Sequence, residues 1–202
     1  MAAAVACGSK GGMAVKASEN PAQSVPSAEN TEIRQVDDLG RRLPFETRHA
    51  HRWNPANNGT VYEPCTALTV RELESLGVAA STVRDAAGTD GQTLRGCTWD
   101  YRAGSLADWR ISQFVGNSAS LSAEKERAST AVDIWLPDVL IGERAVGVHH
   151  FSDGSSCDTY VQSGRAAVTT LVTHVSLPHP PSDEICARAI AFTRATIAEM
   201  PR

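Results

Sequence analysis

The sequence predicts an α+β fold, in which an antiparallel sheet of five to six strands packs with an N-terminal and a C-terminal helix. Three observations support this class. Apolar and polar residues alternate over residues 97–115, turns are expected at Gly142, Gly154 and Gly164, and an apolar stripe of helical period runs through residues 185–197. A sheet with separate helices before and after it is typical of α+β domains. The 202 residues suffice for one domain with its own core.

The first predicted element is a short helix that begins after Thr69. Thr69 as N-cap and Glu72 three residues later form a capping box, while Leu68 and Leu73 occupy the two positions of a hydrophobic staple. Gly77 is the expected C-terminal stop. These local features together predict a helix of about two turns.

Two half-buried strands are expected next, at residues 97–101 and 109–115. Apolar or aromatic residues occupy most alternate positions in both, which is the pattern of a strand with one face in the core. Trp99 and Trp109 are therefore expected to be core residues. Residues 118–130 are a weaker candidate for a short helix, because their apolar stripe is thin.

The second half is predicted to be a meander that ends in a helix. Its strands are expected near residues 138–141, 144–151, 156–162 and 166–176. The prolines that begin at Pro178 end the sheet, since proline cannot donate to a strand ladder. Ser182 is expected to cap the last helix, with Asp183 and Glu184 in its first turn. The residues expected on its buried face are Ile185, Cys186, Ala189, Ile190, Thr193 and Ile197.

Composition and charge exclude some functions. A formal net charge of -4 gives no electrostatic reason to expect nucleic acid as a partner. The sequence contains no run of 18 or more apolar residues, so it predicts no membrane-spanning segment. A local basic run between Arg41 and Arg52 is interpreted as a solvated lead-in, with contact to anionic lipid headgroups as the alternative.

Cys7 is the candidate membrane anchor. It follows Ala4, Val5 and Ala6 and precedes small residues, as at the end of a bacterial lipoprotein signal peptide. We expect residues 1–7 to be the remnant of such a signal, with the translation start upstream and with Cys7 carrying acyl chains such as palmitate. Residues 8–43 are then a flexible tether and lead-in, and residues 44–202 a single domain.

The other four cysteines, Cys65, Cys97, Cys157 and Cys186, are spread across the predicted domain. An even number of cysteines in an exported chain predicts two disulfides, which form and persist in oxidising compartments. Four cysteines allow three connectivities, so their number leaves the pairing open.

A family resemblance rests on four stretches. They are Pro-Cys-Thr-Ala-Leu-Thr at residues 64–69, Cys-Thr-Trp at residues 97–99, Cys157, and Asp-Glu-Ile-Cys at residues 183–186. In this order they resemble an uncharacterised family of actinobacterial envelope lipoproteins, catalogued as domain of unknown function thirty-five fifty-eight. The resemblance implies a secreted, lipid-anchored domain without an established activity. With it, we expect disulfides between Cys65 and Cys186 and between Cys97 and Cys157.

Candidate catalytic and metal sites have simpler interpretations. His49 with His51 lacks a third ligand, and the neighbours His149 and His150 would point to opposite faces of a strand, so we expect no metal and no cofactor. Ser155 with Asp153 and His150 is better explained as a turn than as a hydrolase site. We therefore expect no enzymatic activity, and a hydrolase is the remaining low-ranked alternative.

Two tryptophans are the candidate binding surface. Trp53 and Trp135 are expected in irregular, proline-adjacent segments, where an aromatic ring is more readily exposed than in a strand interior. We expect a monomeric protein on the outer face of the cell membrane, with a non-enzymatic binding or accessory role toward an envelope protein or lipid. The alternative is a carrier that holds a hydrophobic envelope lipid or glycolipid between sheet and helix.

Overall fold

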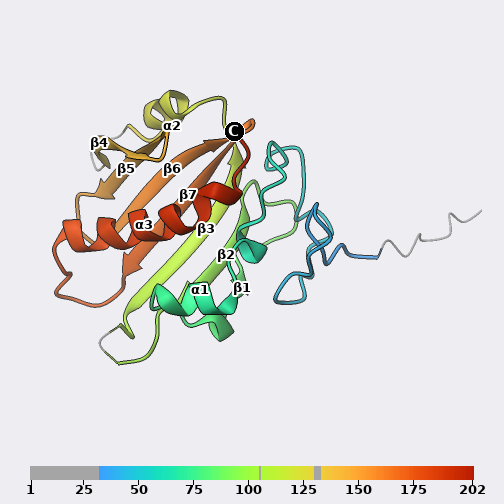
Figure 1. The fold of residues 1–202 in the computed structure, drawn as a ribbon, viewed down its shortest axis with the longest axis horizontal. Helices are drawn as coiled ribbons and strands as arrows, with labels where there is room; N and C mark the ends of the chain where they lie inside the picture. The colour runs from blue at the N-terminus through green and yellow to red at the C-terminus, as the bar shows by residue number, and fades with distance from the viewer. Residues whose placement is uncertain (1–31, 105, 130–132) are drawn as a thin grey trace, which may run out of the picture. The chain divides into compact units, whose positions relative to one another are not determined.

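The computed structural model describes residues 32–104, 106–129 and 133–202. It confirms the α+β class: the described residues form a seven-stranded antiparallel sheet with the order β1-β2-β3-β7-β6-β5-β4 (Figure 1). The strands are β1 Arg84–Asp85, β2 Arg95–Asp100, β3 Trp109–Asn117, β4 Asp133–Ile141, β5 Arg144–Phe151, β6 Ser156–Ser163 and β7 Ala166–His174. The strand beyond the expected five to six is β1, a two-residue edge strand that no alternation pattern could reveal.

Within the described residues, three α-helices and three 3-10 helices accompany the sheet. They are η1 Pro64–Thr66, α1 Val70–Ser75, η2 Ala80–Thr82, α2 Leu121–Arg127, α3 Ser182–Thr196 and η3 Ile197–Glu199. The capping box is confirmed, because the Thr69 hydroxyl accepts from the Glu72 N–H while the Glu72 carboxylate accepts from the Thr69 N–H. At α3 the predicted cap is wrong. Pro181 is the N-cap and Ser182 is already helical, so its hydroxyl does not cap the helix.

The main core lies between the sheet and α3, which crosses one face of the sheet (Figure 1). Trp99 and Trp109 are buried in it, as predicted, and the Trp99 ring lies 5.7 Å from that of Phe192. Most of the predicted stripe is buried, but Ile190 is only partly buried and the sequence analysis missed Phe192. Burial of such side chains typically contributes about 1.5–3 kcal/mol each.

The predicted disulfide pairing is wrong. Cys65 is bonded to Cys97, and Cys157 to Cys186, with Cα–Cα distances of 5.4 and 5.0 Å. The reason is spatial order: η1 packs on β2 and β3, whereas α3 packs on β5, β6 and β7. Each disulfide therefore joins a helical element to the strand beneath it.

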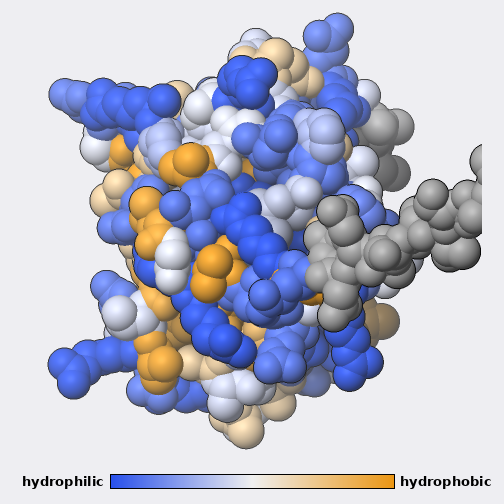
Figure 2. All heavy atoms as spheres, turned by 90° about the vertical axis from the view of Figure 1, so that its right-hand side faces the viewer, coloured by the Kyte–Doolittle hydropathy of each residue, from blue (hydrophilic) through white to orange (hydrophobic). Residues whose placement is uncertain are grey.

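Packed structure begins before residue 44, the predicted start of the domain. Val36 pairs with Arg42 in an isolated bridge, and Asp37 and Leu43 are both buried. Cys7 and the rest of residues 1–31 lie outside the described residues. Figure 2 shows the side of the molecule on the right of Figure 1, where the visible described residues are mostly hydrophilic and apolar side chains form small separate groups.

Gly96 provides a test of the β2–β3 register. A Cβ on Gly96 would lie 1.9 Å from the carbonyl oxygen of Gln113, which belongs to the paired strand. We expect Gly96→Ala to lose about 3 kcal/mol or more of unfolding free energy, or to prevent folding, because rigid backbone must move. Gly88→Ala is the control, since its Cβ would meet only Gln92 Oε1 at 3.7 Å. Equal thermal unfolding midpoints of the two variants would contradict this register.

Candidate functional site

A groove of about 380 Å³ crosses the sheet face opposite α3, over β3, β7 and β6. Its floor comes from side chains that alternate with those facing α3. Phe114 and Gly116 of β3 and Ala167, Thr169 and Leu171 of β7 form most of this floor. The groove is therefore a consequence of the period-two pattern on the face that α3 leaves uncovered.

Small residues shape the groove where it meets the segment before β2. A Cβ on Gly116 would lie 2.6 Å from Leu94 Cδ2, so a larger residue at position 116 would displace the Leu94 side chain from its place against β3. Leu94 is still 40% exposed and, with Thr93 and Ala56, lines this side of the groove. One wall is thus formed by residues that neighbour the start of β2.

Helix α2 supplies the opposite wall. Ser120 caps α2 by accepting from the Ala123 N–H, and Glu124 and Arg127 line the groove. Arg127 donates to Glu124 Oε2 from Nη2 at 2.6 Å and from Nε at 3.2 Å. The Glu124 side chain is 9% exposed and that of Arg127 67% exposed, so the pair places a nearly buried carboxylate beneath an accessible guanidinium.

A buried polar cluster lies at the β6 end of the groove. His149 Nδ1 lies 2.6 Å from Asp158 Oδ1, and the Tyr160 hydroxyl donates to Asp158 Oδ2 at 3.0 Å. Burial and the negative charge of Asp158 raise the pKa of Tyr160, so the phenol stays protonated. Asp158 and Tyr160 line the groove, and both oxygens of the Asp158 carboxylate accept or share hydrogen bonds.

The two predicted surface tryptophans lie in different places. Trp135 does not lie in an irregular segment as expected, because β4 begins at Asp133 and pairs Trp135 with His149. Its side chain is half-buried beside the polar cluster, 5.1 Å from His149 and 5.2 Å from Tyr160 between ring centroids. Trp53 is half-buried between the guanidinium groups of Arg34 and Arg52, at 4.2 and 4.6 Å. The structure does not bring them together, and neither residue lines the groove.

The other candidates from the sequence remain separate. The Ser155 amide and hydroxyl both donate to Asp153 Oδ1, which is turn geometry and confirms the turn interpretation. His49 is half-buried and His51 pairs with Asp90 at 2.7 Å on the surface. Among residues 32–104, 106–129 and 133–202, no three acidic, histidine or cysteine residues are grouped as metal ligands.

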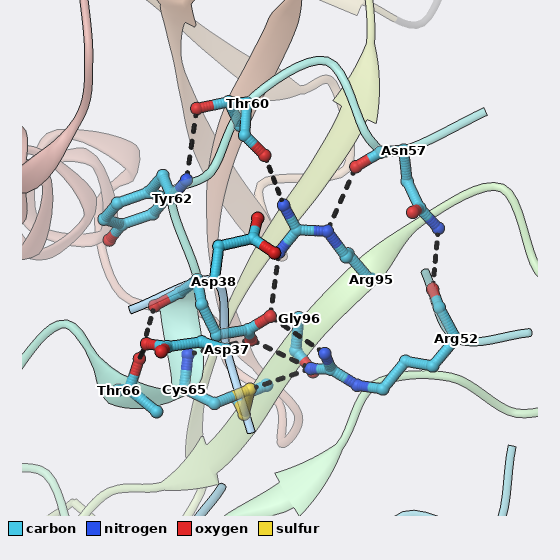
Figure 3. A network of polar contacts seen from close by, with 12 residues as sticks. Asp37, Asp38, Arg52, Asn57, Thr60, Tyr62, Cys65, Thr66, Arg95 and Gly96 are labelled. Carbon is cyan, nitrogen blue, oxygen red and sulfur yellow. Dashed lines mark hydrogen bonds and ion pairs between the residues drawn. A yellow bond between two sulfur atoms is a disulfide. The ribbon is translucent and has the colours of Figure 1, made fainter. Parts of the chain in front are cut away.

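A buried ion cluster holds the loop that borders the groove (Figure 3). Glu63 accepts from Arg52 Nη1 and Nη2 at 2.8 and 2.9 Å and from Arg95 Nη1 at 2.8 Å, and all three side chains are fully buried. Arg52 also contacts Asp85 at 3.1 Å. Burial opposes the charge on Arg52, but the carboxylates of Glu63 and Asp85 outweigh it and raise the pKa of Arg52.

Arg95 connects this cluster to the groove wall. Its Nε and Nη2 donate to the carbonyl oxygens of Asn57 and Thr60 at 3.0 and 2.8 Å. The neighbouring Ala56 accepts from the Asn117 N–H at the end of β3, at 2.7 Å. The interpretation of Arg52 as a solvated residue is therefore wrong. Sequence reasoning also missed Glu63 and Arg95, because no local pattern indicates a buried charge.

Glu63→Gln tests the cluster. Loss of the carboxylate leaves two buried guanidinium groups without their shared counter-charge, and we expect about 3–5 kcal/mol less unfolding free energy in urea denaturation. Asp100→Asn is the control, because Asp100 pairs with the exposed Arg84 and Arg110 and should cost about 1 kcal/mol or less. A Glu63→Gln loss as small as that of the control would contradict the structural role of the cluster.

Asp37 predicts a pH dependence. Burial opposes its charge, but hydrogen bonds from Thr66 and Arg41 outweigh burial and hold the pKa of Asp37 below its ordinary value of 3.8. A lowered folded-state pKa contributes stability above the unfolded value, and that contribution is lost as pH falls through the folded value. We expect Asp37→Asn to destabilise the protein at pH 7 and progressively less below about pH 4.

Urea denaturation between pH 3 and pH 7 measures this difference. Asp38→Asn is the control, since Asp38 pairs with Arg34 at a position where both side chains are 37% exposed. An Asp37→Asn deficit that stays constant down to pH 3 would contradict the assignment.

Comparison with known proteins identifies a family. No curated protein and no solved structure matches this chain. A family model matches residues 2–199, and its description is "Protein of unknown function (DUF3558)". This match spans nearly all of the chain, including every element of the sheet and all three α-helices. The chain therefore belongs to DUF3558, a family of proteins of unknown function.

Proposed function

We propose that this protein is an exported, lipid-anchored cell-envelope protein with a non-enzymatic binding role, and that the groove opposite α3 is its binding site. The observation that carries the proposal is a preformed concavity of about 380 Å³, with the apolar Phe114 and Leu171 in its floor and the charged Glu124 and Arg127 in its wall. Small-molecule sites combine these features at volumes of roughly 300–1,000 Å³.

Export is supported by the two disulfides, which are typical of oxidising compartments outside the cytoplasm. None of the helices in the described part of the chain has the length and apolar character of a membrane-spanning segment. The proposed attachment is therefore through acyl chains on Cys7, in the small-residue context of Ala4 to Gly8. Two acyl chains suffice for stable anchoring.

A binding role is favoured over catalysis by how the polar groups of the groove are used. Asp158 is engaged by His149 and Tyr160, and Glu124 by Arg127. Both carboxylates are therefore held in place before a ligand arrives, and such preorganised hydrogen-bonding groups suit recognition. The groove therefore supports recognition.

The groove is also favoured over a lipid site between sheet and helix. That interface is packed with buried side chains, among them Ile111, Ile185 and Phe192. On the groove side, a purely hydrophobic ligand would cover Arg127, whose charge has no partner in such a ligand. A carrier of an envelope lipid remains the alternative, with the groove and not the helix interface as its site.

Native mass spectrometry of the protein extracted in mild detergent from its own cells tests the binding role. We expect a non-covalent adduct on the wild type and on Thr173→Phe, but not on Thr169→Phe. Thr169 lies in the groove floor, whereas Thr173 lies four residues further along the same face of β7 and outside the groove. An adduct retained by Thr169→Phe, or absent from all three proteins, would contradict the proposal.

The same spectra test the anchor. Covalent acyl mass is expected on the wild type and not on Cys7→Ala. Acyl mass that persists on Cys7→Ala would refute attachment through this residue while leaving the groove result intact.

A further inference from the structure

The groove combines two surfaces that few ligands match together. Its floor presents the half-buried ring of Phe114 beside the apolar side chain of Leu171, and Leu94 adds a further apolar side chain from the first wall. Its sides present hydrogen-bonding groups from Thr93, Asn117, Glu124 and Arg127, and Thr169 adds a hydroxyl in the floor. A matching ligand needs an apolar face and a dense edge of groups that both donate and accept hydrogen bonds.

Charge argues against an anionic ligand. The groove is lined by the carboxylates of Glu124 and Asp158 and by the single guanidinium of Arg127. The Glu124 carboxylate already lies 2.6 Å from Arg127, and with Asp158 the lining carries two carboxylates against one guanidinium. The formal charge of the chain, -4, adds to this bias. A phosphate or carboxylate group would therefore find weak electrostatic support.

An acyl chain is also a poor match. The Arg127 side chain is 67% exposed at the rim, and covering it with hydrocarbon would remove hydrating water without supplying an acceptor. Any part of the Glu124 carboxylate that still faces solvent would likewise lose its water without gaining a hydrogen-bond donor.

The Glu124–Arg127 pair suits neighbouring hydroxyl groups. Both bonds from Arg127 go to Glu124 Oε2, so the guanidinium does not occupy Oε1. A carboxylate oxygen accepts and a guanidinium donates, while each hydroxyl of a vicinal pair can do both. Hydrogen bonds to charged groups are stronger than those between neutral groups, which gives such a pair directional selectivity.

We propose that the groove binds a neutral saccharide, with the hydroxyl edge on Glu124 and Arg127 and the C–H face on Phe114. The negative face of an aromatic ring attracts the weakly positive C–H groups on one side of a sugar ring. The proposal rests on the binding role assigned to the groove above, and it names the ligand class. A saccharide headgroup of a glycolipid and a free oligosaccharide share this chemistry.

Binding of the full-length protein to an array of neutral, acidic and amino glycans measures this preference. We expect the wild type to bind neutral glycans. Arg127→Gln and Glu124→Gln should each weaken this binding at least about tenfold, because each removes one charge-assisted hydrogen bond to the ligand. Arg110→Gln is the matched control, because Arg110 is also paired with a carboxylate and is 59% exposed, but lies outside the groove. It should bind within about twofold of the wild type.

Vesicles with and without a neutral glycolipid distinguish the two sources. Retention of the glycolipid vesicles together with array binding indicates a headgroup, and array binding alone indicates a free glycan. Decanoate serves as the acyl-chain probe. A preference for acidic glycans, or tighter binding of decanoate than of every glycan, would overturn the saccharide assignment. If Thr169→Phe still abolishes that binding, the binding role of the groove stands. Glycan binding that neither Arg127→Gln nor Thr169→Phe changes would overturn the site. If no glycan, vesicle or decanoate binds and the native spectra show no adduct, the binding role itself is overturned.

Discussion

The carboxylate of Glu63, shared by two fully buried guanidinium groups, is the interaction on which the first half of the domain depends. Residues 32–69 contain no strand of the sheet, so their position is fixed by side-chain contacts and by single backbone hydrogen bonds such as that from the Asn117 N–H to Ala56, and not by a backbone ladder. Arg52 and Arg95 both donate to Glu63 Oε2, and the bond between Cys65 and Cys97 closes the same region covalently. A charge cluster so deeply buried is stable only when every member keeps its partners.

This anchoring is what gives the groove its first wall. Arg95 and Leu94 are neighbours, so their side chains point to opposite sides of the chain as it enters β2. Arg95 binds the carbonyl groups of Asn57 and Thr60, while Leu94 lies over Gly116 in the groove. The second wall has an equivalent basis, since Gly147 of β5 leaves room for Leu121 of α2. Gly116 and Gly147 thus each leave room for a leucine at a wall of the site, and the ion cluster holds the loop beside the first wall.

Sequence reasoning succeeded where the determining contacts are local. The capping box at Thr69 and the alternation around Trp99 and Trp109 depend on residues a few positions apart, and the structure confirms them. It failed where the outcome depends on which elements become neighbours. The cysteine pairing follows from α3 packing on β6, and a buried Arg52 looks like an exposed one in the sequence. Alternation also revealed two faces for each strand, but it could not show which face a helix would leave open.

The sheet face that α3 leaves open is proposed as a preformed recognition site for hydroxyl-rich ligands. A crystal structure of the protein isolated from its own cells, without added ligand, would show whether such a ligand occupies it. We predict electron density for a non-protein molecule that contacts Arg127 on one side and Phe114 on the other. Density bound elsewhere, with the groove closed by its own side chains, would contradict the account.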